Sequence, residues 1–551
     1  MAAKAKKEGR RKPAGGSARP RKSGDPTALR AGGAKKQERR RGTSGSIFPQ
    51  WDQETDVLVV GYGAAGANAA IAAHDAGARA LVLEKMGFPG GNSGVCAGAM
   101  LVPENFDEAL RYYRALSFGT VDEEMARAFA EAMVGIPRLL ADLGAQSTVR
   151  RSEAGYFPSL LGGQVRRIQF SPTGAGGFRF LQDLVEKRKI RVLMDTPAVA
   201  LIQDPRTREV IGVKARRMGG EISILARRGV ILASGGYEYN RRMLADFHFP
   251  GAEDYIFPWG APGNTGDGIR LASGAGAELW HMASIEWGAL CAGKPSRKFG
   301  TAVGTGLGWA RPEGGFLFVN RCGKRFMCEN TRLIHRKSPL EILFFDQERA
   351  GYPNLPATMV FDETYRCGGP VASTQAHFEE LWGGPVGYSS IHKIHEWSED
   401  NRAEIDRGWV IQADTLAGLA GKIGADPPAM EETVRRFNRA CGEGGDPEFG
   451  RPGQSMAPLA TPPYYAVELG LTLVNTQGGP RRDKDCRVLG FGGRAIPRLY
   501  AAGELGSFFG FLYQGGSNYP EAWAFGRIAG HKAAGQKPYG GPAAKDFRAR
   551  R

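Results

Sequence analysis

The chain has 551 residues, 42% of them hydrophobic and 24% charged, so it can bury a large core without disulfides or a structural metal. Its 79 glycines, about one residue in seven, follow no collagen period and indicate many sharp turns or close approaches of backbone to a ligand. Residues 1–50 hold 15 Lys or Arg against three acids, whereas the rest of the chain carries 58 bases and 54 acids.

The basic excess lies in a Gly, Ala, Arg and Lys segment with almost no large apolar side chain. Such a segment cannot offset its ordering entropy, so we predict a disordered basic tail over 1–50. Nucleic-acid or membrane contact through this tail is the less favoured alternative. We expect no secretory signal, because no long apolar run follows these basic residues. We also expect no membrane span, because the sequence contains no apolar run long enough to cross a membrane. Seven scattered cysteines without a CxxC pair favour a reducing cytoplasm.

The first ordered element is a valine-rich strand over 56–61, which runs into the glycine turn GYGAAG at 61–66. An alanine-rich stretch at 67–76 predicts a helix, and residues 79–84 read as a second parallel strand. In a unit of this kind Gly61 makes the turn, Gly63 admits a pyrophosphate, Gly66 packs the helix, and Glu84 binds ribose. The pattern predicts a dinucleotide site without choosing between NAD and FAD.

Further strands are predicted within 190–236, with a hairpin turn at Gly219-Gly220 and a buried strand that ends in paired glycines. From 286 to 460 the pattern loosens into mixed strands and helices, which we interpret as a separate cap or substrate domain. Strand and glycine signals return at 498–504, and a helix with proline in its first turn follows at 520–530. The nucleotide-binding domain is therefore expected to be split.

Eight short motifs follow one another along the chain. They are GYGAAG at 61–66, Glu84-Lys85, GGNSG at 90–94, ASGG at 233–236, TGDG at 265–268, NTQGG at 475–479, AAGE at 501–504 and GGSN at 515–518. Their order resembles the FAD-dependent oxidoreductase 2 family, which contains the flavoprotein subunits of fumarate reductase and succinate dehydrogenase and the 3-ketosteroid dehydrogenases. The resemblance covers roughly residues 55–535.

The resemblance implies an α/β fold with a Rossmann-like FAD-binding domain, split into 55–285 and 461–540, around an inserted α+β cap at 286–460. Members that attach FAD covalently use a histidine shortly after the second strand. Residues 86–105 contain none, so noncovalent FAD is expected. The residues that the resemblance places at FAD are Gly61, Gly63, Ala65, Gly66, Glu84, Lys85, Gly91, Asn92, Ser93, Val199, Asp267, Glu504, Asn518 and Tyr519.

Roles follow from what a flavin nucleotide needs. The backbone at Gly91 to Ser93 would approach the pyrophosphate and ring, while Asp267 and Glu504 would accept hydrogen bonds from FAD hydroxyls. The amides of Asn518 and Tyr519 would open a helix toward the pyrimidine edge, where a helix N-terminus favours negative charge.

The residues expected around the substrate differ from those of fumarate reductases. Those enzymes place a histidine before the paired glycines of the motif that corresponds to NTQGG, and an arginine in the last flavin loop, to bind a dicarboxylate. Here Asn475 occupies the first position, and residues 507–518 contain no arginine. That loop instead carries three phenylalanines, Tyr513 and Gly516, similar to the Tyr and Gly with which 3-ketosteroid dehydrogenases hold a ketone oxygen. Two donors on a carbonyl acidify its α-hydrogen by stabilising the developing enolate.

The resemblance therefore implies a dehydrogenase that introduces an α,β double bond into a ketone, such as a 3-ketosteroid or an oxocyclohexane carboxylate. Its partners would be this small-molecule substrate and an external electron acceptor. A reductase of an activated double bond is the alternative, and a nucleic-acid-binding flavoprotein is third. No metal site is expected, since His392 and His395 read as an exposed helix face.

Tyr156 lies in a stretch that resembles one carrying an active-site tyrosine in the ketosteroid enzymes. The proton-abstracting tyrosine of those enzymes corresponds here to Leu333, with His335 nearby as a further catalytic candidate. The α-proton base and the oligomeric state are left open by the sequence.

Overall fold

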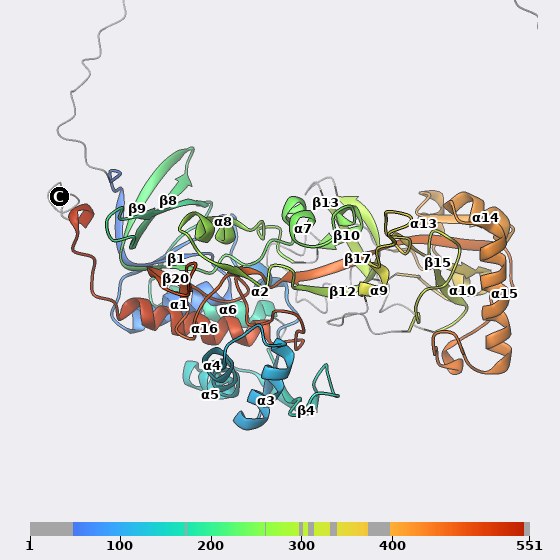
Figure 1. Cartoon of the computed structure of the whole chain (residues 1–551), viewed down its shortest axis with the longest axis horizontal. Helices are drawn as coiled ribbons and strands as arrows, with labels where there is room; N and C mark the ends of the chain where they lie inside the picture. The colour runs from blue at the N-terminus through green and yellow to red at the C-terminus, as the bar shows by residue number, and fades with distance from the viewer. Residues whose placement is uncertain are drawn as a thin grey trace, which may run out of the picture. The chain divides into compact units, whose positions relative to one another are not determined.

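The computed structural model describes residues 48–170, 174–258, 260–296, 301–306, 313–330, 339–372 and 397–544 (Figure 1). Nearly all of the predicted basic tail lies outside these residues, and so do His335, His392 and His395. The elements described below all belong to the unit that begins at Pro49.

An eight-stranded sheet carries the nucleotide-binding motifs. Its main order is β19-β20-β9-β1-β2-β6, and an antiparallel pair, β7 and β8, extends from β9. The strands are β1 Gln53–Val60, β2 Ala80–Leu83, β6 Arg191–Leu193, β7 Ala198–Gln203, β8 Val210–Arg217, β9 Gly220–Leu232, β19 Arg487–Leu489 and β20 Ala495–Ala501. Strands β20, β9, β1, β2 and β6 run parallel, so their carboxyl ends meet at one edge of the sheet.

Two helices from opposite ends of the chain pack together against this sheet. Helix α1, Ala64–Asp75, follows the first glycine turn, and helix α16, Asn518–Ala534, lies beside it (Figure 1). Small side chains make this approach possible, since a Cβ on Gly526 or Gly530 would collide with α1 backbone oxygens. Helix α6, Gly174–Lys187, also contacts α1. The N-terminal elements β1 to β9 and the C-terminal elements β19, β20 and α16 therefore contribute to one layered structure.

A second, seven-stranded sheet is centred on the long strand β17, Tyr464–Thr476. Its other strands are β10 Ile256–Pro258, β12 Ile285–Ser296, β13 Thr301–Gly306, β14 Phe316–Val319, β15 Ala357–Asp362 and β16 Val410–Ala413. Most of these strands fall in the expected cap region, although β10 and β17 lie outside 286–460, and the domain boundaries stay a prediction. The helices next to it in the chain are α9 Pro339–Ile342, α10 Glu363–Cys367, α13 Arg402–Asp406, α14 Leu416–Ile423 and α15 Pro427–Glu443.

A smaller antiparallel sheet lies next to the nucleotide-binding elements. It pairs β3, Ala99–Pro103, with β5, Gln164–Gln169, and β5 with β4, Thr148–Ala154. The helices α3 Phe106–Ser117, α4 Glu123–Val134 and α5 Ile136–Leu143 connect β3 to β4. Short elements complete the described chain: α2 Gly91–Val95, α7 Arg241–Phe247, η1 Glu253–Tyr255, α8 Asp267–Gly274, β11 Leu279–Trp280, η2 Gly453–Ser455 and β18 Gly479–Pro480.

The expected α/β fold class is confirmed, and the predicted strands and helices around the glycine turn are present. The hairpin turn predicted at Gly219-Gly220 joins β8 to β9, with Gly219 at φ +77. The helix predicted from 520 begins two residues earlier, at Asn518.

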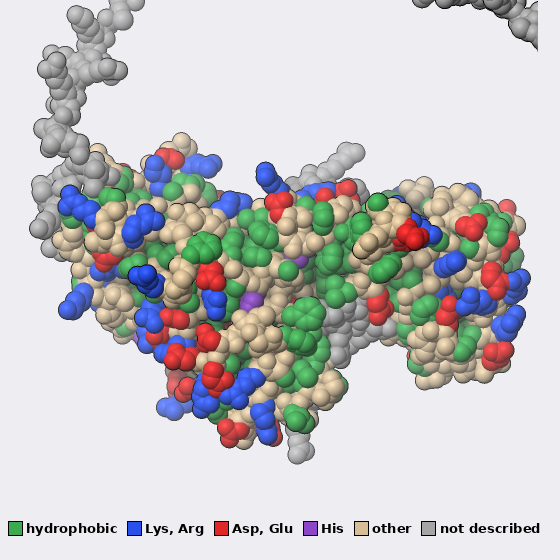
Figure 2. All heavy atoms as spheres, in the orientation of Figure 1, with side chains coloured by type: hydrophobic (Ala, Val, Ile, Leu, Met, Phe, Trp, Pro, Cys, Tyr) green, Lys and Arg blue, Asp and Glu red, His purple; other side chains and the backbone are tan. Residues whose placement is uncertain are grey.

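Charged side chains of both signs are interspersed over the visible face of the molecule (Figure 2). This mixture agrees with the near balance of 58 bases and 54 acids beyond residue 50. Among the residues that the structure describes, no helix combines the length and the apolar character needed to cross a membrane.

Candidate active site

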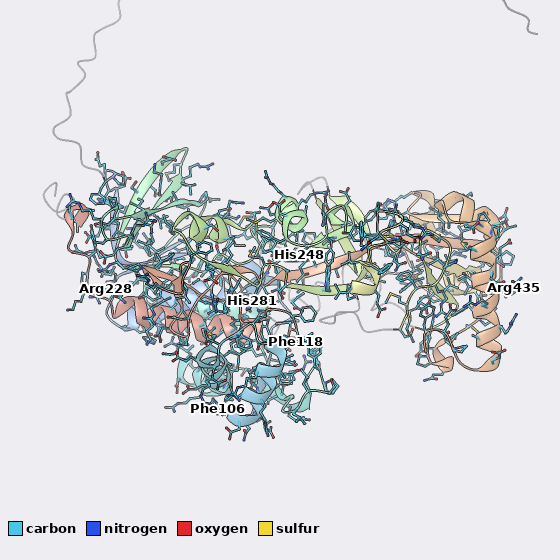
Figure 3. The ribbon with its side chains drawn as sticks, viewed as in Figure 1. Phe106, Phe118, Arg228, His248, His281 and Arg435 are labelled. Carbon is cyan, nitrogen blue, oxygen red and sulfur yellow. The ribbon has the colours of Figure 1, made fainter. Side chains whose placement is uncertain are left out.

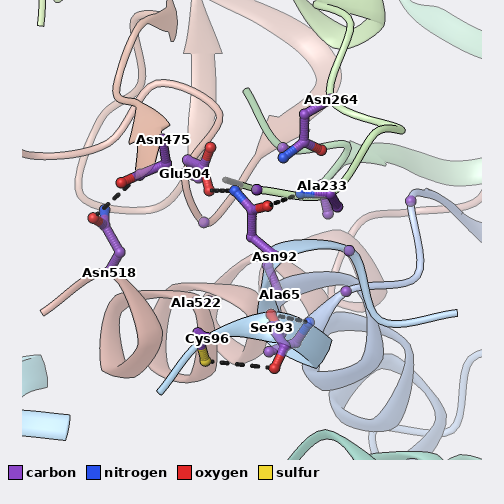
Figure 4. Close-up of a pocket in the computed structure, with 18 of the residues that line it drawn as sticks. Ala65, Asn92, Ser93, Cys96, Ala233, Asn264, Asn475, Glu504, Asn518 and Ala522 are labelled. Carbon is purple, nitrogen blue, oxygen red and sulfur yellow. Dashed lines mark hydrogen bonds between the residues drawn. The ribbon is translucent and has the colours of Figure 1, made fainter. Parts of the chain in front are cut away.

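A cavity of about 790 Å³ opens at the carboxyl edge of the parallel strands. Its lining combines segments that are far apart in sequence, including both sides of the first glycine turn, helix α2, the ends of β9 and β20, and the start of α16 (Figure 4). The predicted residues that line it are Gly61, Gly63, Ala65, Glu84, Lys85, Gly91, Asn92, Ser93, Tyr156, Asp267, Glu504, Tyr513, Gly516, Asn518 and Tyr519.

The glycine turn has the shape that a dinucleotide requires. Gly61 adopts φ +104, and a Cβ there would collide with the Ala233 carbonyl, while a Cβ on Gly66 would collide with the Gly61 carbonyl. Gly66 does not line the cavity, which agrees with its expected role in helix packing. Gly91, at φ +49, has open space where its Cβ would stand. Gly61, Gly63 and Gly91 therefore line a cradle without side chains, and the cradle fits a pyrophosphate beside the N-terminus of α1.

Glu84 occupies the position expected for a ribose-binding acid, at the end of β2. Its carboxylate accepts hydrogen bonds from the backbone amides of Tyr62 and Met86 at 2.8 and 2.9 Å. These two amides fix the orientation of the carboxylate, while burial raises its pKa. Replacing Glu84 with alanine would therefore remove an acceptor from two backbone donors as well as from FAD.

Lys85 and Asp267 form an ion pair at the N-terminus of α8. The Lys85 ammonium donates to Asp267 Oδ2 at 2.6 Å and to Thr265 Oγ1 at 2.7 Å. The side chains are 25% and 28% exposed, so the pair is reachable from the cavity. Burial opposes the charge on Asp267, but the bond and the charge of Lys85 give it a net lowered pKa. A carboxylate held ionised in this way can still accept from a cofactor hydroxyl.

Helix α2 places its polar side chains against the cavity. Ser93 Oγ accepts from the Ala64 amide at 3.0 Å and so joins α2 to the start of α1 (Figure 4). Asn92 accepts from the Ala261 amide at 2.6 Å and donates to two glutamates, Glu238 and Glu504, at 2.8 and 2.9 Å. Sequence reasoning missed Glu238, which is fully buried two residues after the paired glycines of ASGG.

The substrate end is built from the loop that precedes α16. Tyr513 is 5% exposed, and its ring meets Phe509 edge to face at 4.9 Å between centroids. Its hydroxyl accepts a hydrogen bond from the Asn518 amide at 3.1 Å. Burial raises the pKa of Tyr513 well above its usual value, so the hydroxyl keeps its proton and can act as a donor.

This loop is anchored on both sides. His281, labelled in Figure 3, has its Nδ1 2.8 Å from the Ser507 carbonyl oxygen, and its ring stacks on Trp280. Burial lowers the pKa of His281 to about 4, so the imidazole is neutral and Nδ1 donates to that carbonyl. From α16, Glu521 accepts from Ser507 Oγ at 2.7 Å and from the Phe508 amide at 3.0 Å. The start of the loop that carries Phe508, Phe509 and Tyr513 is therefore held from two sides.

Gln514 joins Tyr156 to the same loop. Its side-chain oxygen accepts from the Tyr156 amide at 3.0 Å and from the Tyr112 hydroxyl at 2.6 Å. Gly516 adopts φ +78, and its carbonyl accepts from the Leu101 amide at 3.0 Å. The structure thus brings Tyr156, Tyr513 and Gly516 together in the part of the cavity wall formed by the loop that precedes α16.

Two expected residues differ from their predicted positions. Val199 is half-buried in β7 and does not line the cavity, whereas its neighbour Ala198 does. The strand places alternate side chains on opposite faces, so a shift of one residue moves the contact. The Asn518 amide, expected to face the flavin, donates to Tyr513 instead. His335 lies outside the described residues.

Acid precipitation of the purified protein is expected to release intact FAD into the supernatant. No histidine is found among the described residues that line the cavity. Burial raises the pKa of the lining Cys96 to about 12, so this side chain stays a thiol and a poor nucleophile. Yellow colour that remains with the precipitated protein would instead demonstrate covalent attachment.

Gly63→Ala is expected to weaken FAD binding about 10-fold or more, equivalent to ~1.4 kcal/mol, without loss of the fold. The new methyl would meet only the Gly90 carbonyl at 3.4 Å and Ser93 Oγ at 3.6 Å, both ordinary contacts, but it would stand in the cavity wall. Gly274→Ala adds the same methyl at an exposed helix end, with nothing within 4 Å, and serves as control. Equal FAD affinity in the two variants, measured by fluorescence titration, would contradict the cradle.

Comparison with known proteins identifies the family to which this chain belongs. The sequence profile of a family described as "FAD binding domain" matches residues 56–519. NADH:acrylate oxidoreductase of Vibrio harveyi is 31% identical over 379 residues, which are 68% of this chain and 33% of that protein. 4-Oxocyclohexanecarboxylate 2-dehydrogenase of Sinomonas cyclohexanicum is 28% identical over 565 residues, covering 87% of this chain and 93% of that protein.

The solved structure of 3-ketosteroid delta1-dehydrogenase from Sterolibacterium denitrificans, in complex with 1,4-androstadiene-3,17-dione, is similar with a TM-score of 0.70. The two sequences are 26% identical, and the match covers 88% of this chain and 99% of that one. The chain thus spans one third of the acrylate oxidoreductase but nearly all of the two dehydrogenases. With a family match over most of its length, the chain belongs to the FAD binding domain family and is an FAD-dependent oxidoreductase.

Proposed function

We propose that this enzyme desaturates a cyclic ketone next to its carbonyl group. The observation that carries the proposal is the position of Tyr513, whose protonated hydroxyl lines the cavity while its ring packs on the buried Phe509. Because the hydroxyl accepts the Asn518 amide hydrogen bond, its own proton points away from that amide. A ketone oxygen at the cavity end is the acceptor that such a hydroxyl would serve.

In the proposed reaction the ketone loses two hydrogens as a proton and a hydride. The α-carbon loses a proton to a base, the electron pair of that C–H bond forms the new double bond, and the β-carbon loses a hydride. Bound FAD would supply the two-electron acceptor for that hydride. An external electron acceptor then has to reoxidise the cofactor. The product is an α,β-unsaturated ketone.

The chain contributes mainly to the proton-loss half of this reaction. Tyr513 would donate to the ketone oxygen, with the backbone at Gly516 beside it, and negative charge developing on that oxygen would be stabilised as the α-proton leaves. Among the residues that the structure describes, Tyr156 is the candidate base that would accept the α-proton. Gln514 holds its backbone amide at the same end of the cavity. Phe508 and Phe509, both at most 1% exposed, form an apolar wall behind Tyr513 and limit water there.

The two dehydrogenase relatives support this direction, because each is named for dehydrogenation of a cyclic ketone. The alternative is reduction of an activated C=C bond, which the acrylate oxidoreductase relative supports. Against it stands the described loop at residues 507–518, which carries no arginine to pair with a small carboxylate substrate.

An anaerobic flavin-bleaching screen tests the proposal. The oxidised enzyme would be mixed with a 3-ketosteroid, with 4-oxocyclohexanecarboxylate and with succinate, and the flavin absorbance followed. Bleaching by at least one of the ketones, with the matching enone found as product, is expected. Bleaching by succinate alone would replace the proposal with the reductase alternative run in reverse.

A further inference from the structure

Two buried carboxyl groups meet beside the flavin cavity. Glu238 follows β9 and Glu504 follows β20, which are neighbouring parallel strands, so both side chains reach the same edge of the sheet. They converge on Gly236, where an added Cβ would lie 2.6 Å from both Glu238 Oε2 and Glu504 Oε1. Glycine at this position allows the two acids to approach each other. Glu504 lines the cavity, whereas Glu238 lies behind it with no exposed surface.

Hydrogen-bond donors are divided unequally between the two acids. Glu238 accepts from Asn92 at 2.8 Å, Asn264 at 2.6 Å and Thr476 at 3.4 Å. Glu504 accepts from Asn92 at 2.9 Å through Oε2 (Figure 4). Its other oxygen, Oε1, is buried without a hydrogen-bond partner among the described residues, although the nearby Gly236 backbone amide favours the charged form of Glu504. Hydrogen bonds therefore stabilise the negative charge of Glu238 more than that of Glu504, and Glu504 is the more favourable site for a proton.

No cation neutralises this pair directly among its described hydrogen-bond partners, all of which are neutral side chains. Glu521 adds repulsion to Glu504 but is itself paired with Arg482. Tyr237 and Tyr239 flank Glu238, and burial together with the Glu238 charge raises the pKa of each, so both stay neutral. Burial raises the pKa of Glu238 to about 7, and burial with repulsion from Glu238 raises that of Glu504 well above its usual value.

We propose that Glu238 and Glu504 hold one shared proton at neutral pH, carried on Glu504 Oε1 and directed toward Glu238 Oε2. The pair is then a proton-binding site with a single negative charge, because two buried carboxyl groups that repel each other and have no counterion among their described hydrogen-bond partners do not both ionise. The family resemblance predicts that Glu504 accepts hydrogen bonds from FAD hydroxyls, and the present assignment makes it a neutral acid. The inference depends on FAD binding and not on the identity of the substrate.

The shared proton links FAD binding to pH. Losing it would add a second buried negative charge to a cavity that has to hold the anionic pyrophosphate of FAD. FAD binding should therefore weaken as pH rises through the titration of the pair. For one proton the dissociation constant rises at most 10-fold for each pH unit, or about 1.4 kcal/mol.

The test is the dissociation constant of FAD from the full-length protein, measured by fluorescence titration from about pH 6 to about pH 9. Wild type should show the one-proton rise, whereas Glu504→Gln, which lacks the proton-bearing acid, should show a nearly flat profile. Glu238→Gln keeps Glu504 but removes the repulsion that raises its pKa, so the rise should move to lower pH. Asp204→Asn is the matched control. Asp204 is a buried acid away from the cavity, accepts from the Tyr539 hydroxyl at 2.5 Å, and should not alter the wild-type profile.

Infrared spectroscopy gives an independent readout that does not need turnover. A carboxylic-acid C=O band should be present in wild type at neutral pH and disappear in Glu504→Gln but not in Asp204→Asn. Identical acid bands in wild type and Glu504→Gln would overturn the proposal, and so would a wild-type FAD affinity that is flat over the pH range. Either outcome would leave the ketone-desaturase proposal untouched, because that proposal is tested by flavin bleaching.

Discussion

Tyr513→Phe is expected to slow flavin reduction by a ketone about 10²–10³-fold, or ~2.7–4 kcal/mol in the chemical step. The variant keeps the aromatic ring against Phe509 and removes only the hydroxyl, so FAD affinity should be unchanged. Substrate affinity should change less than the rate, because the bond to the oxygen strengthens as negative charge develops. Stopped-flow measurement of anaerobic flavin bleaching gives both quantities.

Tyr113→Phe is the matched control for this experiment. Tyr113 is fully buried behind the wall, edge to face with Phe508 at 5.8 Å between centroids, and it does not line the cavity. Its loss of a hydroxyl should leave flavin reduction nearly as in wild type. Equal rates in the two variants would assign Tyr513 to packing, and Tyr156 would become the next residue to test.

Arg482→Met is expected to lower the free energy of unfolding by about 3–5 kcal/mol. Arg482 and Glu521 form an ion pair with both side chains at 0% exposure, and Glu521 in turn holds Ser507 and the Phe508 amide. Without the guanidinium, Glu521 is a buried charge with no counterion. The loss should shrink as pH falls, because Glu521 then takes up a proton and becomes neutral. Urea unfolding of the flavin-loaded protein at two pH values measures both effects.

The control for this variant is a surface ion pair from the same part of the chain. Arg487 contacts Asp483 at 2.7 Å, but its side chain is 49% exposed. Arg487→Met should therefore cost about 0–1 kcal/mol. If Arg482→Met were as stable as Arg487→Met, the buried pair would not be what fixes the loop that carries Tyr513.

The nucleotide cradle could be predicted from the sequence because its parts are local. A strand, a glycine turn and a helix follow one another within residues 53–75, and Gly66 is required by a contact with the Gly61 carbonyl only five residues away. Helix α16 was predicted for the same reason, from the proline in its first turn, and its start at Asn518 lies two residues before the predicted one. Geometry of this kind depends on residues that are close together in the sequence, so it can be predicted from them.

The acid pair could not be predicted in this way, because it depends on contacts across the whole chain. Asn92 meets Glu238 and Glu504 over separations of 146 and 412 residues, and nothing in a motif states that two like charges will share a buried site. The only local signal was a glutamate directly after GGY at 235–237. The shift from Val199 to Ala198 reflects a strand register that a resemblance between motifs does not fix to the residue.

The direction and the class of reaction are tested most directly by one isotope experiment. The oxidised enzyme would be mixed anaerobically with a cyclic ketone, either unlabelled or deuterated at the β-carbon, and flavin bleaching followed in the stopped flow. Our account predicts bleaching with formation of the enone, slowed by β-deuteration because that C–H bond breaks in hydride transfer. It would be contradicted if no cyclic ketone bleached the flavin while acrylate or fumarate rapidly reoxidised the reduced enzyme.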